Sequence, residues 1–90
     1  MSVFKFKHFT IYQDLVGMKV GTDSIILGSA IKIKSKYKHI LDVGAGTGLL
    51  SIMIAQKSSN SDITAVEIDS NAYHQAKINI DKCKWRNRIN

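Results

Sequence analysis

The residues of this sequence that could do chemistry are concentrated in one short glycine-rich segment, DVGAGTG, at positions 42–48. Glycine has no Cβ atom, so alternate glycines let the backbone turn sharply and approach a ligand closely. Apolar runs flank the segment on both sides, which places the glycines between a strand and a helix. The first turn of that helix would present free N–H groups and a positive dipole end to an anionic group. A glycine-rich turn without a ligand is the alternative, and this setting favours a ligand site.

An acid at the end of the next apolar run, Glu67, is the second candidate for binding chemistry. A carboxylate at the end of a strand can accept hydrogen bonds from both hydroxyl groups of a ribose. The same arrangement suits NAD, and a solvated charge at a strand end is a further alternative. Glu67 therefore does not identify the ligand by itself.

These residues need a parallel α/β framework to bring them together. The short apolar runs 39–43 and 63–67 predict strands, and the segment 49–57 predicts a helix. A further helix begins at Asp69 or Ser70. Its apolar positions recur at helical spacing: Ala72, Ala76 and Ile80. The order strand, helix, strand, helix is typical of a parallel sheet with right-handed crossovers.

An N-terminal extension precedes this framework. Phe4 and Phe6 alternate with lysines and predict a short strand, and a turn or bulge near His8 reverses the phase of the alternation. A helix should begin at 22–24 and fade in the lysine-rich stretch before residue 39. We expect its core face to contain the following apolar residues: Ile26, Leu27, Ala30, Ile31 and Ile33. The chain is then one domain, with an extension and first helix at 1–38 and two strand–helix units at 39–90.

Composition narrows the class of protein. The chain has 90 residues, a formal net charge of +6 and one cysteine, Cys83, so it cannot form an internal disulfide bond. No apolar stretch is long enough to span a membrane, and the three histidines lack the spacing of metal ligands. A cytoplasmic protein without metal is the expectation. The basic residues concentrate in two clusters: Lys32, Lys34, Lys36 and Lys38, and Lys82, Lys84, Arg86 and Arg88. These clusters either keep the chain soluble or contact RNA.

The glycine spacing resembles that of a known family. The dinucleotide fingerprint is G-x-G-x-x-G, whereas the glycines here follow G-x-G-x-G with an acid two residues before the first. That pattern resembles motif I of class I S-adenosylmethionine-dependent methyltransferases. The resemblance implies a Rossmann-like fold and S-adenosylmethionine as cofactor, with Asp42 holding the methionine amino group and Glu67 the ribose. It assigns the remaining cofactor contacts to the loop and to the residue after the acid: Gly44, Ala45, Gly46, Thr47, Gly48 and Ile68.

The sequence upstream of the glycines resembles a narrower group, the bacterial tRNA adenine-N6 methyltransferases that modify an adenine beside the anticodon of a valine tRNA. The resemblance covers the whole chain and is carried by several short motifs: F-x-F-x-x-F at 4–9, QD at 13–14, MKVGTD at 18–23 and LG at 27–28. It implies tRNA as partner. It also implies that Thr22 and Asp23 line the pocket over the methionine end of the cofactor, although each could simply cap a helix.

The chain departs from that group in one respect. Adenine-N6 methyltransferases use an Asn-Pro-Pro-aromatic motif to receive the target amine, and this chain contains no proline. No catalytic residue is therefore assigned, and we expect the 90 residues to be the N-terminal portion of a larger enzyme, inactive alone. Methylation of rRNA or of a protein glutamine, a non-catalytic binding module and a nicotinamide-dependent oxidoreductase remain alternatives. The sequence does not indicate an oligomeric state.

Overall fold

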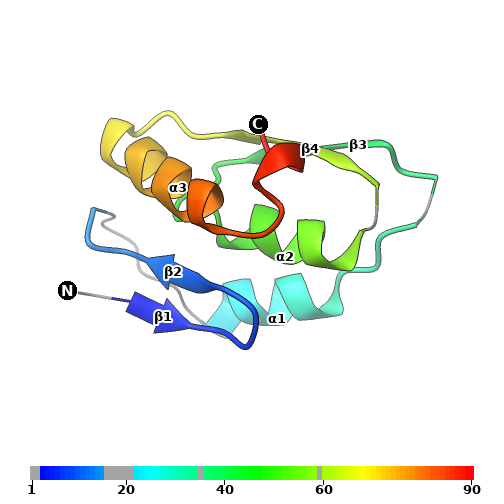
Figure 1. The fold of residues 1–90 in the computed structure, drawn as a ribbon, viewed down its shortest axis with the longest axis horizontal. Coiled ribbons are helices and arrows are strands. Elements are labelled where there is room, and N and C mark those ends of the chain that lie inside the picture. Colours follow the sequence, from blue (N-terminus) through cyan, green and yellow to red (C-terminus); the bar gives the residue numbers. More distant parts are fainter. Residues whose placement is uncertain (1–2, 16–21, 35, 59) are drawn as a thin grey trace.

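The computed structural model describes residues 3–15, 22–34, 36–58 and 60–90, and these have the expected α/β architecture (Figure 1). In chain order the elements are β1 (Val3–Lys5), β2 (Thr10–Tyr12), α1 (Thr22–Ala30), β3 (His39–Val43), α2 (Leu49–Lys57), β4 (Asp62–Val66), α3 (Ser70–Lys82) and the 3-10 helix η1 (Arg86–Arg88). The predicted strand at 39–43 and helix at 49–57 are confirmed with the same bounds. The next strand lies one residue earlier than predicted, so Glu67 follows it.

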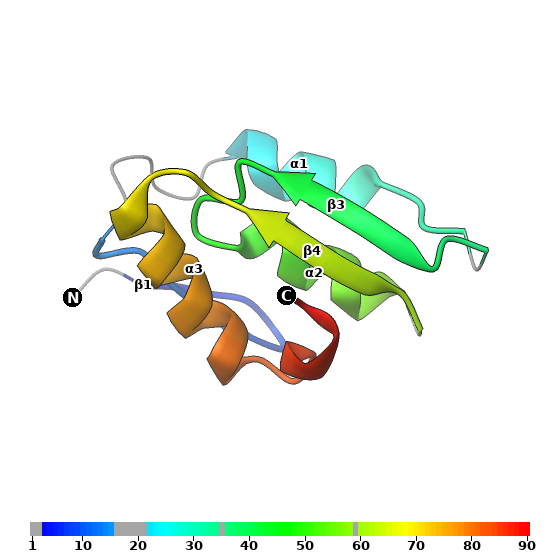
Figure 2. The ribbon, with the colours of Figure 1, turned by 90° about the horizontal axis from the view of Figure 1, so that it is seen from above.

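β3 and β4 pair in parallel, with Leu41 opposite Thr64 and Val43 opposite Val66. The helices α1 and α2 lie on one side of this sheet, which Figure 2 shows from its other side. Leu41 and Val43 are 62% and 73% exposed, whereas Ile63, on the face toward α2, is fully buried. The apolar strand 39–43 is therefore buried on one face only, because the helices of the described residues cover a single face.

The chain returns to the sheet at its last two residues. The Asn90 N–H donates to the Ile63 carbonyl at 2.7 Å, and the Ala65 N–H donates to the Asn90 carbonyl at 2.8 Å. Ile89 forms a parallel bridge with Ile63. This is the hydrogen-bond pattern of a parallel pair, so Ile89 and Asn90 add a short further stretch of parallel pairing beside β4.

The N-terminal extension forms a small antiparallel hairpin. β1 and β2 pair through Val3–Tyr12, Phe4–Ile11 and Lys5–Thr10. The predicted turn near His8 is confirmed, because the Phe6 N–H donates to the Phe9 carbonyl across it at 2.9 Å. Three rings continue from the hairpin to Trp85, three residues beyond α3: Phe6 lies 4.7 Å from Phe9, and Phe9 lies 6.2 Å from Trp85 between centroids. Ile11 beneath them is fully buried in the main core.

α1 packs differently from the prediction. Ile26 and Leu27 are 59% and 51% exposed, and among residues 24–30 of the helix the buried position is Gly28. A Cβ atom built on Gly28 would lie 2.3 Å from the sulfur of Met53 in α2, so the absent side chain permits the close approach of the two helices. The predicted core face is therefore wrong within the helix. Ile31 and Ile33 do pack against the core, but from the chain after the helix has ended.

Cationic side chains from later in the chain cap the C-terminal ends of two helices. The ammonium group of Lys57 donates to the carbonyls of Ser29 and Ile31, at 2.6 and 2.8 Å, where α1 ends. The guanidinium of Arg88 does the same for α2. It donates to four oxygen atoms around the end of that helix: Ala55 O at 2.7 Å, Ser61 O at 2.9 Å, Ser58 O at 3.0 Å and Ser58 Oγ at 3.2 Å. Both contacts satisfy carbonyls that a helix end leaves unpaired and complement its negative dipole end.

We expect Arg88→Ala to lower the free energy of unfolding by about 1.5–3 kcal/mol, since hydrogen bonds to a charged group contribute in that range. Arg88→Lys should recover only part of the loss, because an ammonium group lacks the planar fork that reaches several acceptors. Urea unfolding followed by circular dichroism measures the effect. Arg86→Ala, at an exposed position, is the matched control and should change stability by less than about 0.5 kcal/mol. Overlaid curves for Arg88→Ala and the unchanged chain would contradict the capping role.

Candidate functional site

The predicted glycine loop joins the carboxyl end of β3 to the start of α2. All three of its glycines have positive φ angles: 74° at Gly44, 58° at Gly46 and 86° at Gly48. The loop is held against the end of β4, since the N–H groups of Gly44 and Ala45 both donate to the Val66 carbonyl at 2.7 and 3.0 Å. The alternating glycines therefore serve a backbone conformation that side-chain-bearing residues rarely adopt.

The structure brings the second candidate, Glu67, directly to this loop. Its Oε1 atom accepts a hydrogen bond from the Gly46 N–H at 2.7 Å, and its Oε2 atom accepts one from the Asp69 N–H at 3.1 Å. Each carboxylate oxygen can accept a second hydrogen bond, so the half-buried carboxylate keeps capacity for a ligand. Asp69 caps α3 as expected, because its carboxylate accepts from the Ala72 N–H at 2.9 Å.

Asp42 is fixed by a partner that the sequence analysis missed. The carboxylate is 7% exposed, and its Oδ2 atom accepts a hydrogen bond from the hydroxyl of Ser51 at 2.6 Å. Ser51 is fully buried in an otherwise apolar stretch of α2. A lone serine in an apolar helical segment could have signalled this partner. The contact leaves the Oδ1 atom of Asp42 as the acceptor not used by Ser51.

The other assigned residues are placed as follows. Ile68 follows Glu67 and is 98% exposed, while Thr47 is 7% exposed. Thr22 and Asp23 lie in the first turn of α1, and their side chains are outside the described part of the structure. The preceding residues 18–21 of the resemblance also lie outside it.

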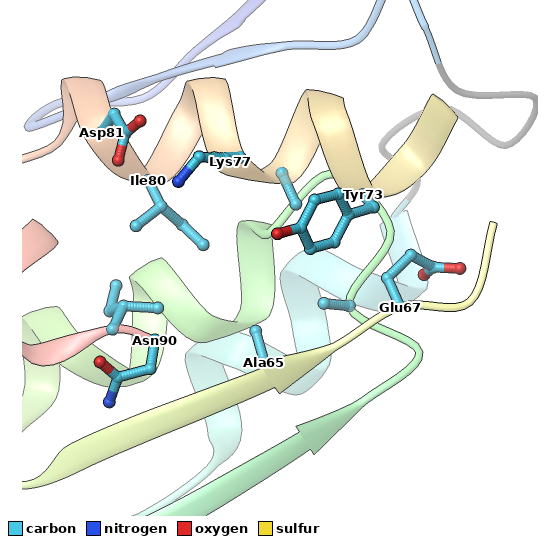
Figure 3. A pocket seen from close by; sticks show the side chains of 10 residues that line it. Ala65, Glu67, Tyr73, Lys77, Ile80, Asp81 and Asn90 are labelled. Atoms are coloured by element: carbon cyan, nitrogen blue, oxygen red, sulfur yellow. The ribbon is translucent and has the colours of Figure 1, made fainter. Parts of the chain in front are cut away.

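A pocket of about 270 Å³ opens beside Glu67, between β4 and α3 (Figure 3). Tyr73, Lys77 and Ile80 extend from α3 toward it, and Ala65 lies on the strand side. Its lining also includes Ala45, Ala76, Asp81, Ile89 and Asn90. The pocket joins one loop residue and the Glu67 carboxylate to a largely apolar wall, an arrangement that suits a flat organic group with a few polar atoms.

Cys83 and the C-terminal basic cluster are further residues that the sequence singles out. Cys83 is 5% exposed at the end of α3, and burial raises the pKa of its thiol, which favours the neutral form over a nucleophilic thiolate. Of the C-terminal basic cluster, Lys82, Lys84 and Arg86 are exposed, whereas Arg88 is occupied at the end of α2.

Within the described residues no group of acids, histidines and cysteines could hold a metal ion. No helix among them is long and apolar enough to cross a membrane.

Comparison with known proteins gives consistent matches. Residues 17–90 match the family described as methyltransferase small domain. The chain is 53% identical over 89 residues to a protein of Glaesserella parasuis named tRNA1(Val) (adenine(37)-N6)-methyltransferase. It is 49% identical over 88 residues to a protein of the same name from Trichodesmium erythraeum. These alignments cover 99% and 96% of this chain but 37% and 36% of the relatives, so the chain spans little more than a third of their length.

The fold also matches a solved structure, the precorrin-6y C5,15-methyltransferase of Geobacter metallireducens. The match has a TM-score of 0.66 at 20% sequence identity and covers 91% of this chain and 41% of that one. It confirms the expected Rossmann-like fold, of which this chain contains the N-terminal portion.

Proposed function

This chain belongs to the methyltransferase small domain family, and on that premise we propose that its 44–48 loop binds S-adenosylmethionine for methyl transfer to the N6 amine of an adenine in tRNA. The observation that carries the proposal is the hydrogen bond from the Gly46 N–H to the Glu67 carboxylate at 2.7 Å. It joins the glycine loop and the acid of the next strand–helix unit in one site. Both features were expected to contact the cofactor.

The donor set fits the cofactor. The amino group of its methionine part is cationic, and Asp42 offers a buried carboxylate with one oxygen oriented by Ser51. The ribose hydroxyls are donors, and Glu67 offers a carboxylate at the rim of a pocket. When bound, the cofactor supplies a methyl group made electrophilic by its sulfonium. The residues of this chain bind and orient it.

The tRNA substrate is supported by the names of the relatives and by charge. Two relatives at 49–53% identity are named as tRNA adenine-N6 methyltransferases. Lysines and arginines outnumber acids by 13 to 7 in this chain, which has a net charge of +6, and such a charge attracts a polyanion. The whole enzyme would comprise this chain and a further portion equivalent to the part of the relatives that this chain does not match. A tRNA substrate favours the cytoplasm as its location.

We expect Glu67→Ala to weaken the binding of S-adenosylhomocysteine by about 1.5–3 kcal/mol, the range for hydrogen bonds to a charged group. The variant removes the ribose acceptors and also the Gly46 contact. Glu67→Gln should cost less, because one acceptor oxygen remains. Isothermal titration calorimetry on the 90-residue chain at millimolar ligand measures both.

Asp62→Ala is the matched control, since it removes an exposed acid at the opposite end of β4 and should leave the affinity unchanged. NAD⁺, titrated in parallel, should bind more weakly than S-adenosylhomocysteine. Equal affinity across the unchanged chain and both Glu67 variants would show that Glu67 does not contact the ligand. Preferential binding of NAD⁺ would overturn the cofactor assignment.

A further inference from the structure

Asn79, in the third turn of α3, is fully buried and makes three hydrogen bonds to other parts of the chain. Its amide nitrogen donates to the Tyr12 carbonyl at 2.8 Å, and its amide oxygen accepts from the Tyr12 N–H at 2.7 Å. The same nitrogen donates to the Thr47 carbonyl in the glycine loop at 2.7 Å. Both donor hydrogens of the amide are thus used, one on the hairpin and one on the loop.

The contact with Thr47 fixes one peptide plane of the loop. The carbonyl of the Thr47–Gly48 peptide accepts from Asn79, and its N–H donates to the Ala45 carbonyl at 2.9 Å. A peptide unit held at both ends cannot rotate without breaking a hydrogen bond, one of them in a buried setting where the loss is costly. The orientation of this plane determines where the neighbouring N–H groups of the loop point.

The contact with Tyr12 fixes the hairpin. A side-chain amide that pairs with both the N–H and the carbonyl of one strand residue takes the place of a neighbouring strand. One helical turn earlier, the Gln75 side chain accepts from the Leu15 N–H at 2.9 Å. Gln75 is 2% exposed and contacts the hairpin in this way. Gln75 and Asn79 together dock the end of the hairpin on α3, and Asn79 is the member that also reaches the loop.

From this geometry we infer that Asn79 is a positioning residue that couples the docking of the N-terminal hairpin to the conformation of the cofactor loop. The inference rests on the proposed function, because it takes the loop to be the cofactor site. Coupling of this kind is reciprocal: a ligand that stabilises the loop also stabilises the docked hairpin. The hairpin would therefore contribute to cofactor affinity through Asn79, without a contact between β1 or β2 and the ligand.

The test is amide hydrogen exchange of the 90-residue chain with and without saturating S-adenosylhomocysteine, read at Leu15. The Leu15 N–H is bound to Gln75 and not to Asn79, so it reports on hairpin docking. In the unchanged chain we expect the ligand to slow this exchange about fivefold or more, the lower end of usual coupling between sites. In Asn79→Asp the two donors are lost, and a carboxylate faces the carbonyls of Tyr12 and Thr47. We expect that variant to bind the ligand about tenfold more weakly, a loss in the range of one or two buried hydrogen bonds. At saturation it should show no ligand-dependent change at Leu15.

Gln75→Ala is the matched control. It loosens the hairpin on the same helix face but leaves the Thr47 contact in place, so it should speed exchange at Leu15 while the ligand affinity falls by less than about threefold. If Asn79→Asp fails to fold, the exchange measurement on the unchanged chain still tests the coupling. Ligand binding without slower exchange at Leu15 would overturn it. Retention of the ligand effect in a folded Asn79→Asp variant would overturn it as well. Absence of any ligand binding to the unchanged chain would instead contradict the proposed function. The coupling through Asn79 would then be overturned as well, because it rests on that function.

Discussion

The 90-residue chain alone is expected to transfer no methyl group to tRNA, although it contains the proposed cofactor loop. An amine must be held in line with the sulfonium for transfer to occur, and such orientation accounts for a large share of catalysis in reactions of this kind. The Asn-Pro-Pro-aromatic motif that receives the amine in adenine-N6 methyltransferases cannot be present in a chain without proline. The cofactor should also bind weakly, because the described sheet consists of β3, β4 and the short pairing at Ile89, and it presents Leu41 and Val43 to solvent.

A radiolabelled methyl-transfer assay on unmodified tRNA tests this expectation. The positive control is a chimaera in which this chain replaces the matched segment of the Glaesserella parasuis relative, to which it is 53% identical. The chimaera should transfer methyl groups, and the isolated chain should remain at background. Weak RNA binding that declines with salt should persist in the isolated chain, because exposed residues such as Lys82, Lys84 and Arg86 supply it. Robust turnover by the isolated chain would overturn the assignment of the chemistry to a portion outside it.

Gly46→Val is expected to abolish the binding of S-adenosylhomocysteine. Gly46 has a φ angle of 58°, where a β-branched residue is strongly strained. A Cβ atom added there would meet nothing within 4 Å, so it would project into open space at the loop whose N–H group binds Glu67. That space is where the proposed ligand approaches. The valine would therefore both distort the loop and obstruct the site.

A graded series separates these two effects. Gly46→Ala introduces the strain, about 1–2 kcal/mol for a left-handed residue, with little added bulk, and should weaken binding without abolishing it. Calorimetry gives the affinities, and circular dichroism establishes that both variants keep their secondary structure. Unchanged affinity in a folded Gly46→Val variant would remove the loop from the cofactor site.

The sequence predicted the central framework because its signals are local. The apolar run 39–43 ends directly in glycines, so the strand, the loop and the start of α2 follow from neighbouring residues. The position of Glu67 followed from the same pattern one unit later. The core face of α1 could not be found in this way. Its periodicity placed Ile26 and Leu27 inside, whereas the approach of Gly28 to Met53 determines which side of the helix is buried.

The remaining parts of the candidate site depend on contacts between residues distant in sequence. Ser51 and Asn79 are ordinary polar residues within helices, and their roles appear only when the helices place them against Asp42 and Thr47. For Arg88 the sequence predicted a role that the structure does not favour. Its position among basic residues suggested an RNA contact, whereas its guanidinium is bound to carbonyls at the end of α2.

The two capped helices have a consequence for how this chain is completed as it leaves the ribosome. Lys57 lies 28 residues after Ser29, whose carbonyl it caps, and Arg88 lies 33 residues after Ala55. The end of α1 therefore stays unfinished until α2 has been synthesised, and the end of α2 stays unfinished until the chain has passed α3. The ends of α1 and α2 are thus completed in the direction of translation, each by a cation synthesised after the helix that it caps.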